Sequence, residues 1–259
     1  MELQSIINKI KEKKELQGIS VLVIKDNVLK YLKKHSLNIE NISAQDSKII
    51  IKDIRSELRF FVGQYQISPK KRDNASSSDK FEELLKTHSS TSERLEFYPQ
   101  LEKIILDLKI NSILDLGCGL NPLALSNKEI EYFATDINVD ELSIIEEYFK
   151  KNKFKGHTFV YDLRNISSDL PKTDLTILFK VLDVVSKKDR KLSESIILSV
   201  KSKYILVSFS TKKISGKPMN FPERIWFEKI LLRNNLKFEK FYSNNEVFYL
   251  ITLSSSYRI

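Results

Sequence analysis

The segment Ile113-Leu-Asp-Leu-Gly-Cys-Gly-Leu-Asn-Pro-Leu-Ala-Leu125 (ILDLGCGLNPLAL) decides the fold of this 259-residue chain. An apolar run leads to Asp115, Gly117 and Gly119 follow, and a helical pattern begins near Pro122. Glycine accepts positive φ and lets a ligand approach the bare backbone. The spacing therefore predicts a buried strand, a tight turn and a helix, with a ligand at the turn. Two glycines alone also fit an ordinary turn.

Short β-type runs alternate with helical patterns around and after this segment. The strand candidates are Ser112–Leu116, Tyr132–Asp136, Thr158–Tyr161, Leu175–Phe179 and Tyr204–Phe209. The helix candidates between and after them are Leu142–Lys150, Lys188–Val200 and Pro222–Arg233. This alternation predicts a parallel sheet with helices on both faces.

The last two β-type runs have a different connection. Lys237–Tyr242 and Val247–Leu253 alternate in period two on either side of Ser243-Asn244-Asn245, whose residue types favour turns. They predict an antiparallel hairpin. A seven-stranded parallel sheet that ends in such a hairpin is similar to the class I AdoMet-dependent methyltransferases, an α/β fold with a Rossmann-like sheet.

Three acidic residues stand at the ends of successive predicted strands, namely Asp115, Asp136 and Asp162. A carboxylate close to the glycine turn disfavours a phosphate ligand, whereas S-adenosylmethionine (AdoMet) carries an ammonium group and no phosphate. Asp136 would accept hydrogen bonds from both ribose hydroxyls, Asp162 would accept one from the adenine amino group, and Leu163 would pack on the ring. Each Asp alone also fits a helix N-cap. The three together predict an AdoMet site.

Residues 1–86 are predicted to form a separate helical domain, and residues 87–259 the sheet-bearing domain. Apolar residues recur at helical spacing in residues 3–10, 24–32 and 49–61. A stretch without periodicity follows and reads as a basic loop. Its basic residues are Lys70, Lys71 and Arg72.

The charge balance is positive in both regions. The chain has 43 Lys and Arg against 34 Asp and Glu, a net charge of +9, and residues 1–86 carry 17 basic and 12 acidic residues. A basic surface attracts polyanions such as nucleic acid. A Lys-rich composition without any such partner is the alternative.

The remaining composition excludes several classes of protein. The single cysteine, Cys118, rules out a disulfide framework and a cysteine-only metal cluster, and we predict no metal site. No apolar run reaches the roughly 18–20 residues of a membrane span, so no membrane partner is expected. The charged, amphipathic N-terminus lacks the apolar core of a signal peptide. We therefore expect a cytoplasmic protein.

A second motif, Thr87-His-Ser-Ser-Thr-Ser-Glu-Arg-Leu95 (THSSTSERL), lies before the first predicted strand. Together with DLGCGLNPLAL it resembles the 16S ribosomal RNA guanine-N7 methyltransferases of the aminoglycoside-resistance type. The resemblance covers roughly residues 81 to 253 and continues through the Leu178–Leu182, Val207–Phe209, Trp226–Glu228 and Asn245–Tyr249 segments. It implies AdoMet as cofactor and methyl transfer to guanine N7 in 16S ribosomal RNA of the 30S subunit.

The resemblance also implies a set of cofactor-binding residues. Arg94 would bind the cofactor's carboxylate, since a guanidinium suits a bidentate grip. An ion pair of Arg94 with a nearby Glu on the same helix is the alternative. The glycine turn would hold the methionine moiety. The implied set is His88, Thr91, Arg94, Asp115, Gly117, Gly119, Asn121, Asp136, Asp162 and Leu163.

On the substrate side, Lys180 would face the methyl-transfer pocket as the catalytic residue. The implied substrate-binding residues are Lys70, Lys71, Arg72, Ser208, Phe209, Lys212, Met219 and Trp226. Met219 and Trp226 also fit plain core packing. The N-terminal region would dock on RNA, and a solvated helical cap over the cofactor site is the alternative.

The departures from the family pattern lie on that same side. Asp183 and Ser210 stand where the family has proline, and Asn220–Glu223 lacks an expected Asn-Tyr pair. The reaction is therefore better defined than the target. Transfer RNA or another ribosomal site stays possible.

The chemistry implied for guanine N7 is undemanding. This nitrogen is nucleophilic in the neutral base, so positioning and electrostatics supply most of the catalysis and no general base is needed. Cys118 lies in the cofactor loop and is a poor candidate for the nucleophile of pyrimidine C5 methylation. A small-molecule methyltransferase and a non-catalytic RNA-binding assembly factor are the rival functions. We expect a monomer.

Overall fold

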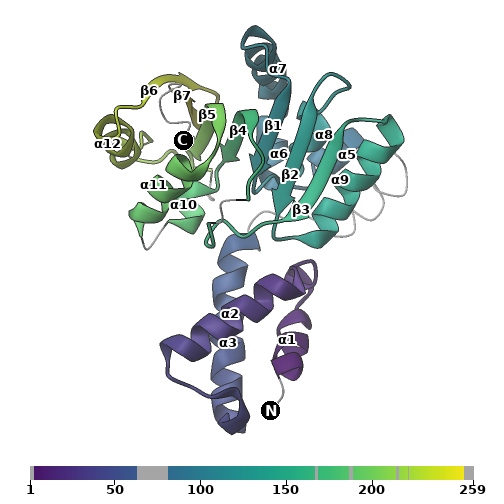
Figure 1. Cartoon of the computed structure of the whole chain (residues 1–259), viewed down its shortest axis with the longest axis vertical. Coiled ribbons are helices and arrows are strands. Elements are labelled where there is room, and N and C mark those ends of the chain that lie inside the picture. The colour runs from purple at the N-terminus through teal and green to yellow at the C-terminus, as the bar shows by residue number, and fades with distance from the viewer. Residues whose placement is uncertain are drawn as a thin grey trace.

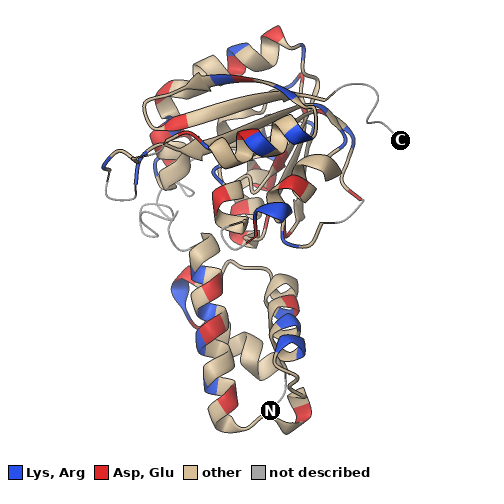
Figure 2. Cartoon of the chain, turned by 90° about the vertical axis from the view of Figure 1, so that its left-hand side faces the viewer, with Lys and Arg blue, Asp and Glu red and all other residues tan. Residues whose placement is uncertain are grey.

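The computed structural model describes residues 3–62, 81–166, 169–186, 189–213, 216–220 and 222–253. In these residues a three-helix region lies beside a larger region built on one sheet (Figure 1). No helix among them is both long and apolar enough to cross a membrane. Lys and Arg are interspersed with Asp and Glu over both regions in the view of Figure 2.

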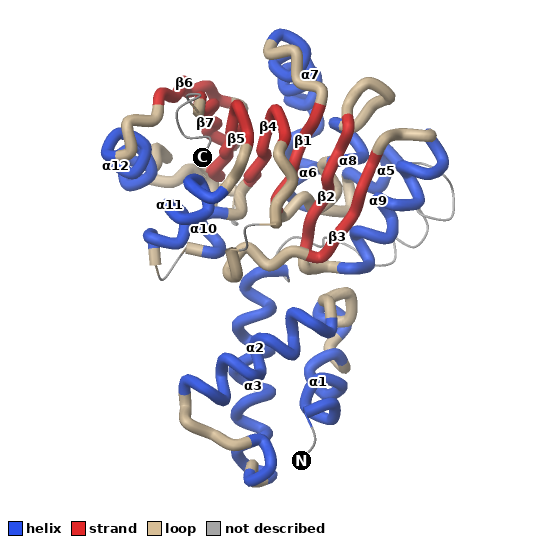
Figure 3. The backbone as a smooth tube through the Cα atoms, in the orientation of Figure 1, coloured by secondary structure: helices blue, strands red, loops and turns tan. Residues whose placement is uncertain are grey.

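The sheet has seven strands in the order β3-β2-β1-β4-β5-β7-β6, and Figure 3 shows them side by side. The strands are β1 (Ser112–Leu116), β2 (Glu131–Asp136), β3 (Gly156–Val160), β4 (Thr173–Phe179), β5 (Ser202–Ser210), β6 (Lys237–Tyr242) and β7 (Glu246–Thr252). The first five pair in parallel, and β7 pairs antiparallel with both β5 and β6. The predicted class I methyltransferase fold is thus confirmed, hairpin included.

Helices cover both faces of the sheet. The helices of this region are α5 (Phe81–Leu85), α6 (Ser89–Arg94), α7 (Tyr98–Asp107), α8 (Pro122–Leu125), α9 (Val139–Asn152), α10 (Leu182–Val185), α11 (Arg190–Ser199) and α12 (Ile225–Arg233). Helices α7 and α9 pack on one face with Ile113 and Ile177, whereas α11 and α12 pack on the other with Leu114 and Val207. Successive strand residues point to opposite faces, so the two apolar sets alternate along each strand.

The three-helix region has an apolar core of its own. It consists of α1 (Leu3–Lys11), α2 (Val21–Lys34) and α3 (Ala44–Val62), with short 3-10 turns at Lys14–Leu16 and Ile39–Asn41. Ile6, Ile10, Ile24, Ile54 and Leu58 are fully or almost fully buried in this core. The helical periodicity of the sequence predicts these helices because their apolar residues recur every three or four positions.

Helix α5 lies before the predicted domain boundary at residue 86 but packs with the sheet-bearing region. Its Leu84 and Leu85 share a small core with Leu123 of α8 and with Leu120, which precedes that helix. The described part of the separate helical region therefore ends with α3 at Val62.

An aromatic cluster holds the hairpin on the sheet. The buried ring of Phe248 on β7 stacks on Phe241 and Phe97, with ring centroids 5.2 and 5.0 Å away, and meets Phe179 edge-on at 5.6 Å. Phe248 therefore joins β6, β4 and the segment before α7.

We expect Phe248→Ala to lower the free energy of unfolding by about 3–5 kcal/mol, because it deletes a fully buried aromatic ring. Urea unfolding of the full chain measures the change. Leu232→Ala on α12 is the control, since Leu232 is 64% exposed and its truncation should cost no more than about 0.5 kcal/mol. Equal losses for the two variants would contradict the role of the cluster.

Candidate cofactor-binding site

A cavity opens at the carboxyl ends of the parallel strands, where ligands bind in sheets of this kind. It holds about 840 Å³ of empty space, counted out to its open mouth. Its wall includes eight of the ten predicted cofactor-binding residues. These are His88, Thr91, Gly117, Gly119, Asn121, Asp136, Asp162 and Leu163.

The glycine turn after β1 forms one side of the cavity. Gly117 and Gly119 have φ of +72° and +50°. A Cβ on Gly117 would lie 2.7 Å from Cγ1 of Val181, and one on Gly119 would lie 3.1 Å from the ring of His88. Both positions thus combine left-handed backbone with a tight approach, which only glycine accommodates well.

Asp136, the last residue of β2, lies directly beside this turn. Its carboxylate accepts hydrogen bonds from the backbone N–H of Gly119 at 3.1 Å and of Asn138 at 3.0 Å. Burial, together with the nearby Glu141 carboxylate, raises the pKa of Asp136 to about 7. The carboxylate is therefore held at the cavity wall in a fixed orientation and titrates near neutral pH.

Asp162 and Leu163 follow β3 and also line the cavity. Leu163 is buried, and the Asp162 carboxylate is gripped by Arg164, with Nε to Oδ1 at 2.8 Å and Nη2 to Oδ2 at 2.6 Å. Arg164, which also lines the cavity, is not among the predicted site residues. The sequence signal that indicates a role for Arg164 is its position two residues after Asp162.

Asp115 lies beneath the glycine turn and not in the cavity wall. It is fully buried, and its carboxylate accepts a hydrogen bond of 2.7 Å from the Tyr132 hydroxyl. Burial raises the pKa of Asp115 to about 7. A direct contact with the cofactor, as predicted, does not fit this placement, and Asp115 supports the turn from below.

Helix α6, from the THSSTSERL motif, closes the cavity beside the turn. The Thr91 hydroxyl donates to the carbonyl of Leu85 at 2.6 Å, which ties α6 to the end of α5. The ring of His88, just before α6, covers Gly119. This packing brings the THSSTSERL motif and the glycine turn to one wall of the cavity, although His88 and Gly119 are more than 20 residues apart in the sequence.

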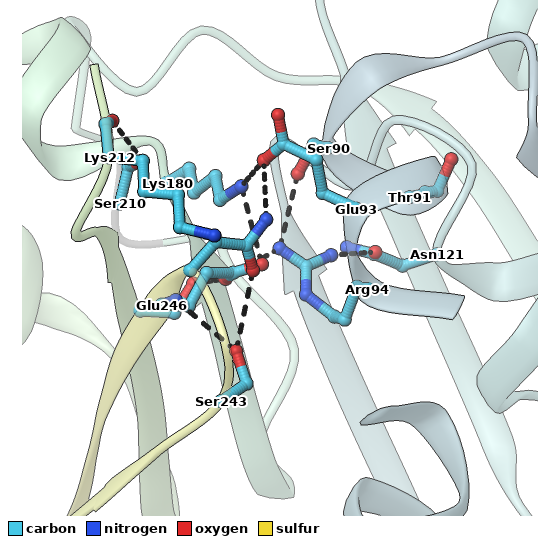
Figure 4. A network of polar contacts seen from close by, with 12 residues as sticks. Ser90, Thr91, Glu93, Arg94, Asn121, Lys180, Ser210, Lys212, Ser243 and Glu246 are labelled. Carbon is cyan, nitrogen blue, oxygen red and sulfur yellow. Dashed lines mark hydrogen bonds and ion pairs between the residues drawn. The ribbon is translucent and has the colours of Figure 1, made fainter. Parts of the chain in front are cut away.

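Arg94 is engaged inside the protein and does not line the cavity. Its guanidinium is fully buried, with Nη2 2.8 Å from Oε2 of Glu246 and Nη1 donating to Oδ1 of Asn121 at 2.7 Å (Figure 4). This arrangement differs from the predicted grip on a cofactor carboxylate. It differs equally from the same-helix alternative, because Glu246 belongs to β7.

Lys180 takes part in the same buried network. Its Nζ lies 2.5 Å from Glu93 and 3.3 Å from Glu246, and Figure 4 shows it between them. Its φ of +58° places a non-glycine residue in the left-handed region at the end of β4. Phe179 and Val181 line the cavity, whereas Lys180 does not. The predicted catalytic side chain is therefore ion-paired beside the cavity.

The Glu246 carboxylate is the centre of this network. Burial alone would raise its pKa, but the Arg94 and Lys180 cations and hydrogen bonds, including one from Ser208 Oγ at 2.6 Å, hold the pKa of Glu246 below its usual value. A buried carboxylate with two cations is compensated.

The residues predicted to contact the target base differ in how deeply they are buried. Ser208 and Phe209 are fully buried, and the Phe209 ring packs edge-on against Trp226 and Phe227. Full burial contradicts a direct contact of either residue with a base, because neither presents a surface. Trp226 is half-buried and packs against this core, in agreement with the alternative that it is a core residue. The Arg190 guanidinium lies over its ring.

Arg224, which the sequence analysis missed, organises this side. Its guanidinium contacts Asp183, with Nη2 2.7 Å from Oδ2, donates to the carbonyls of Ser210 and Pro222, and reaches Met219 Sδ at 3.5 Å. Two of the departures from the family pattern, Asp183 and Ser210, thus meet at one side chain. No spacing in the sequence connects these positions.

The remaining predicted residues lie away from the cavity or outside the described structure. Lys212 is exposed on the segment after β5. Lys70, Lys71 and Arg72 lie outside the described residues. Within the described ranges, no group of three His, Cys, Asp or Glu side chains is arranged to hold a metal ion.

We expect Glu246→Gln to lower the free energy of unfolding by about 3 kcal/mol or more, since it leaves the buried Arg94 without its anion. The difference in stability between wild type and variant should shrink as the pH falls below about 4.5, the usual pKa of Glu. The lowered pKa of Glu246 stabilises the wild type fully above that pH, and this contribution is lost as the pH falls through the lowered pKa. Urea unfolding at several pH values measures it. Glu146→Gln, which breaks an exposed pair with Lys150, is the control at about 0.5 kcal/mol or less. An equal loss in the control would contradict the stabilising role of the buried Glu246 carboxylate.

Comparison with known proteins identifies the family of this chain. The family model for ribosomal RNA methyltransferase (FmrO) matches residues 73–249. The 16S rRNA (guanine(1405)-N(7))-methyltransferase of Micromonospora echinospora is 30% identical over 180 residues, 64% of this chain and 64% of that relative. The chain thus matches less than two thirds of that relative's length.

Two solved structures share the fold over nearly the whole chain. The 16S rRNA methylase RmtB superposes with a TM-score of 0.79 at 22% identity, covering 98% of this chain and 99% of RmtB. The 16S rRNA methyltransferase RmtF, solved in complex with S-adenosyl-L-homocysteine, gives 0.79 at 19% identity, covering 98% of this chain and 100% of RmtF. With the family model matching more than half of its residues, the chain belongs to the ribosomal RNA methyltransferase (FmrO) family.

Proposed function

We propose that this chain transfers the methyl group of AdoMet to N7 of a guanine in 16S ribosomal RNA. The observation that carries the proposal is the cavity lined by the glycine turn, Asp136 and Asp162, in a chain of a ribosomal RNA methyltransferase family. The names of the curated relatives support guanine N7 as the acceptor, and the S-adenosyl-L-homocysteine complex of RmtF supports the cofactor.

The residues of the cavity fit AdoMet chemically. Three carboxylates line it, Asp136, Glu141 and Asp162, and among its described lining residues the one Lys or Arg is Arg164, whose charge faces Asp162. Such a wall suits a cationic ligand and disfavours phosphates. We infer that Asp136 holds the ribose, that Asp162 and Leu163 hold the adenine, and that the glycine turn with His88, Thr91 and Asn121 holds the methionine end.

The chemistry then rests on positioning. AdoMet supplies an electrophilic methyl group on a sulfonium, and guanine N7 attacks it without prior loss of a proton. The chain's residues therefore need to hold the two reactants in line and to exclude water. We infer that Lys180 acts near this point through the network of Glu93 and Glu246, by fixing the end of β4 beside the cavity.

We infer further that the N-terminal region, predicted as residues 1–86 and represented by α1 to α3, docks on the RNA, and that residues 87–259, against which α5 packs, carry out the transfer. The excess of basic over acidic residues in the N-terminal region favours a polyanionic partner. Docking would also involve Lys70, Lys71, Arg72, Lys212, Met219 and Trp226. We propose the 30S subunit as the substrate, a monomer as the active form, and the cytoplasm as the location.

Incubation with methyl-labelled AdoMet tests the proposal. We expect label in 16S ribosomal RNA when the full chain meets 30S particles, and 7-methylguanosine on nucleoside analysis. Free 16S ribosomal RNA and transfer RNA are the parallel substrates.

Label in transfer RNA alone would contradict the ribosomal target. Label in small molecules of a cell extract, with none in RNA, would favour a small-molecule methyltransferase. No label together with no AdoMet binding would favour a non-catalytic RNA-binding factor.

The affinity for S-adenosyl-L-homocysteine should rise about tenfold between pH 6 and pH 8, because the ionised form of Asp136 accepts the ribose hydroxyls and its pKa is about 7. Asp136→Asn should bind more weakly at pH 8 and show a flatter profile. Calorimetry at each pH measures both proteins. Asp115 stays in both proteins and its pKa also depends on the Asp136 charge, so the decisive readout is the loss of affinity at pH 8. Identical profiles would refute the role.

A further inference from the structure

The helical region supplies part of the cofactor cavity. Phe61 and Val62, at the end of α3, line it together with residues of the sheet-bearing region. Figure 1 shows α3 running up to the carboxyl edge of the sheet. The wall of the cavity therefore includes both regions of the chain.

Backbone contacts join the helical region to the chain just after Asp136. Ser20 N–H donates to the carbonyl of Ile137 at 2.9 Å, and Val139 N–H donates to the carbonyl of Gly18 at 2.7 Å. These two bonds form an isolated antiparallel bridge. The segment that follows the proposed ribose-binding carboxylate is thus fixed to the helical region.

A single guanidinium makes the second connection. Arg164 grips Asp162 with Nε and Nη2 and turns Nη1 to the helical region, 2.9 Å from Oδ1 of Asn27 and 3.3 Å from Oε1 of Glu57. Its Cζ lies 4.4 Å from the centroid of the Phe61 ring. We call Arg164, Asp162, Asn27, Glu57 and Phe61 the interdomain clamp.

The clamp is built for geometric specificity. Asn27 is buried, and its Nδ2 donates to the Val23 carbonyl at 2.6 Å, so Oδ1 is oriented toward Arg164. The Arg164 and Asp162 side chains are only 14% and 9% exposed. A planar guanidinium that is bidentate to a carboxylate and stacked on a ring cannot be replaced by an ammonium with the same geometry.

We propose that Arg164 is a positioning residue that couples the helical region to the adenine end of the cofactor cavity. The helical side of the clamp orients Arg164, and Arg164 orients the Asp162 carboxylate for the adenine. The inference rests on the proposed function, because it assigns the adenine to Asp162. RNA that stabilises the helical side of the clamp would strengthen cofactor binding, and by linkage the cofactor would then strengthen RNA binding by the same factor.

Calorimetric titration of the full-length protein with S-adenosyl-L-homocysteine tests the proposal. We expect Arg164→Lys to raise the Kd about tenfold. Asn27→Ala, on the helical side and outside the cavity wall, should raise it about fivefold, a typical size for a coupling between sites. Arg233→Lys is the matched control, because Arg233 forks on Glu194 in the same way at an exposed place, and its Kd should equal that of the wild type.

A second measurement separates coupling from a loss of structure. Saturating 30S particles should lower the Kd of the wild type for S-adenosyl-L-homocysteine, and Asn27→Ala should abolish this decrease while still binding 30S. Where Asn27→Ala fails to fold, Glu57→Gln on the exposed side of the clamp takes its place.

The outcomes distinguish this proposal from the proposed function. The coupling is overturned if both Arg164→Lys and Asn27→Ala have the wild-type Kd and 30S particles leave the wild-type Kd unchanged. That result leaves the methyltransferase function intact. Absence of wild-type binding overturns both. A Kd raised equally by Arg233→Lys also overturns the coupling, because the effect would then be a general one of losing an arginine fork.

Discussion

The buried carboxylate of Glu246 determines how helix α6 sits on the sheet. A charge inside the protein is tolerated only when it is paired and hydrogen-bonded, and Glu246 meets this condition with Arg94, Lys180 and Ser208. Those partners lie on α6, directly after β4 and on β5, so one side chain of β7 ties α6 to neighbouring strands of the sheet. Helix α6 is thereby held against the glycine turn, where the cavity begins.

The cavity follows from this constraint and from the order of the strands. Parallel strands bring the ends of β1, β2 and β3 to one edge, and the glycine turn keeps that edge free of side chains. Carboxylates at the ends of β2 and β3 give the cavity its acidic wall. The helical region completes the wall with Phe61, which places the part proposed to meet RNA next to the part proposed to hold the cofactor.

Much of this arrangement is predictable from the sequence, because periodicity and turn residues act locally. The strand at Ser112–Leu116 and that at Lys237–Tyr242 have the predicted bounds, and the other five differ by a few residues at their ends. Helix α7 is missed although Pro99 stands in its first turn. The residues of the cavity wall can be predicted from motifs because each motif is one short, continuous segment of the chain.

Partners that are distant in sequence are not predictable in this way. Arg94 and Glu246 are 152 residues apart, and no pattern in either segment announces their contact. Arg164 and Arg224 each join three or more segments, so their roles depend on the finished fold. Phe209 has a residue type that suits stacking on a base, but the packing of α12 buries it.

The cavity between the glycine turn, Asp136 and Leu163 is the proposed site of the AdoMet cofactor. A crystal structure of the full chain with S-adenosyl-L-homocysteine tests it most directly. We expect the adenine on Leu163, the ribose hydroxyls on Asp136 and the amino-acid end at Gly117 and Gly119. Ligand bound elsewhere, or bound with its ribose away from Asp136, would contradict it.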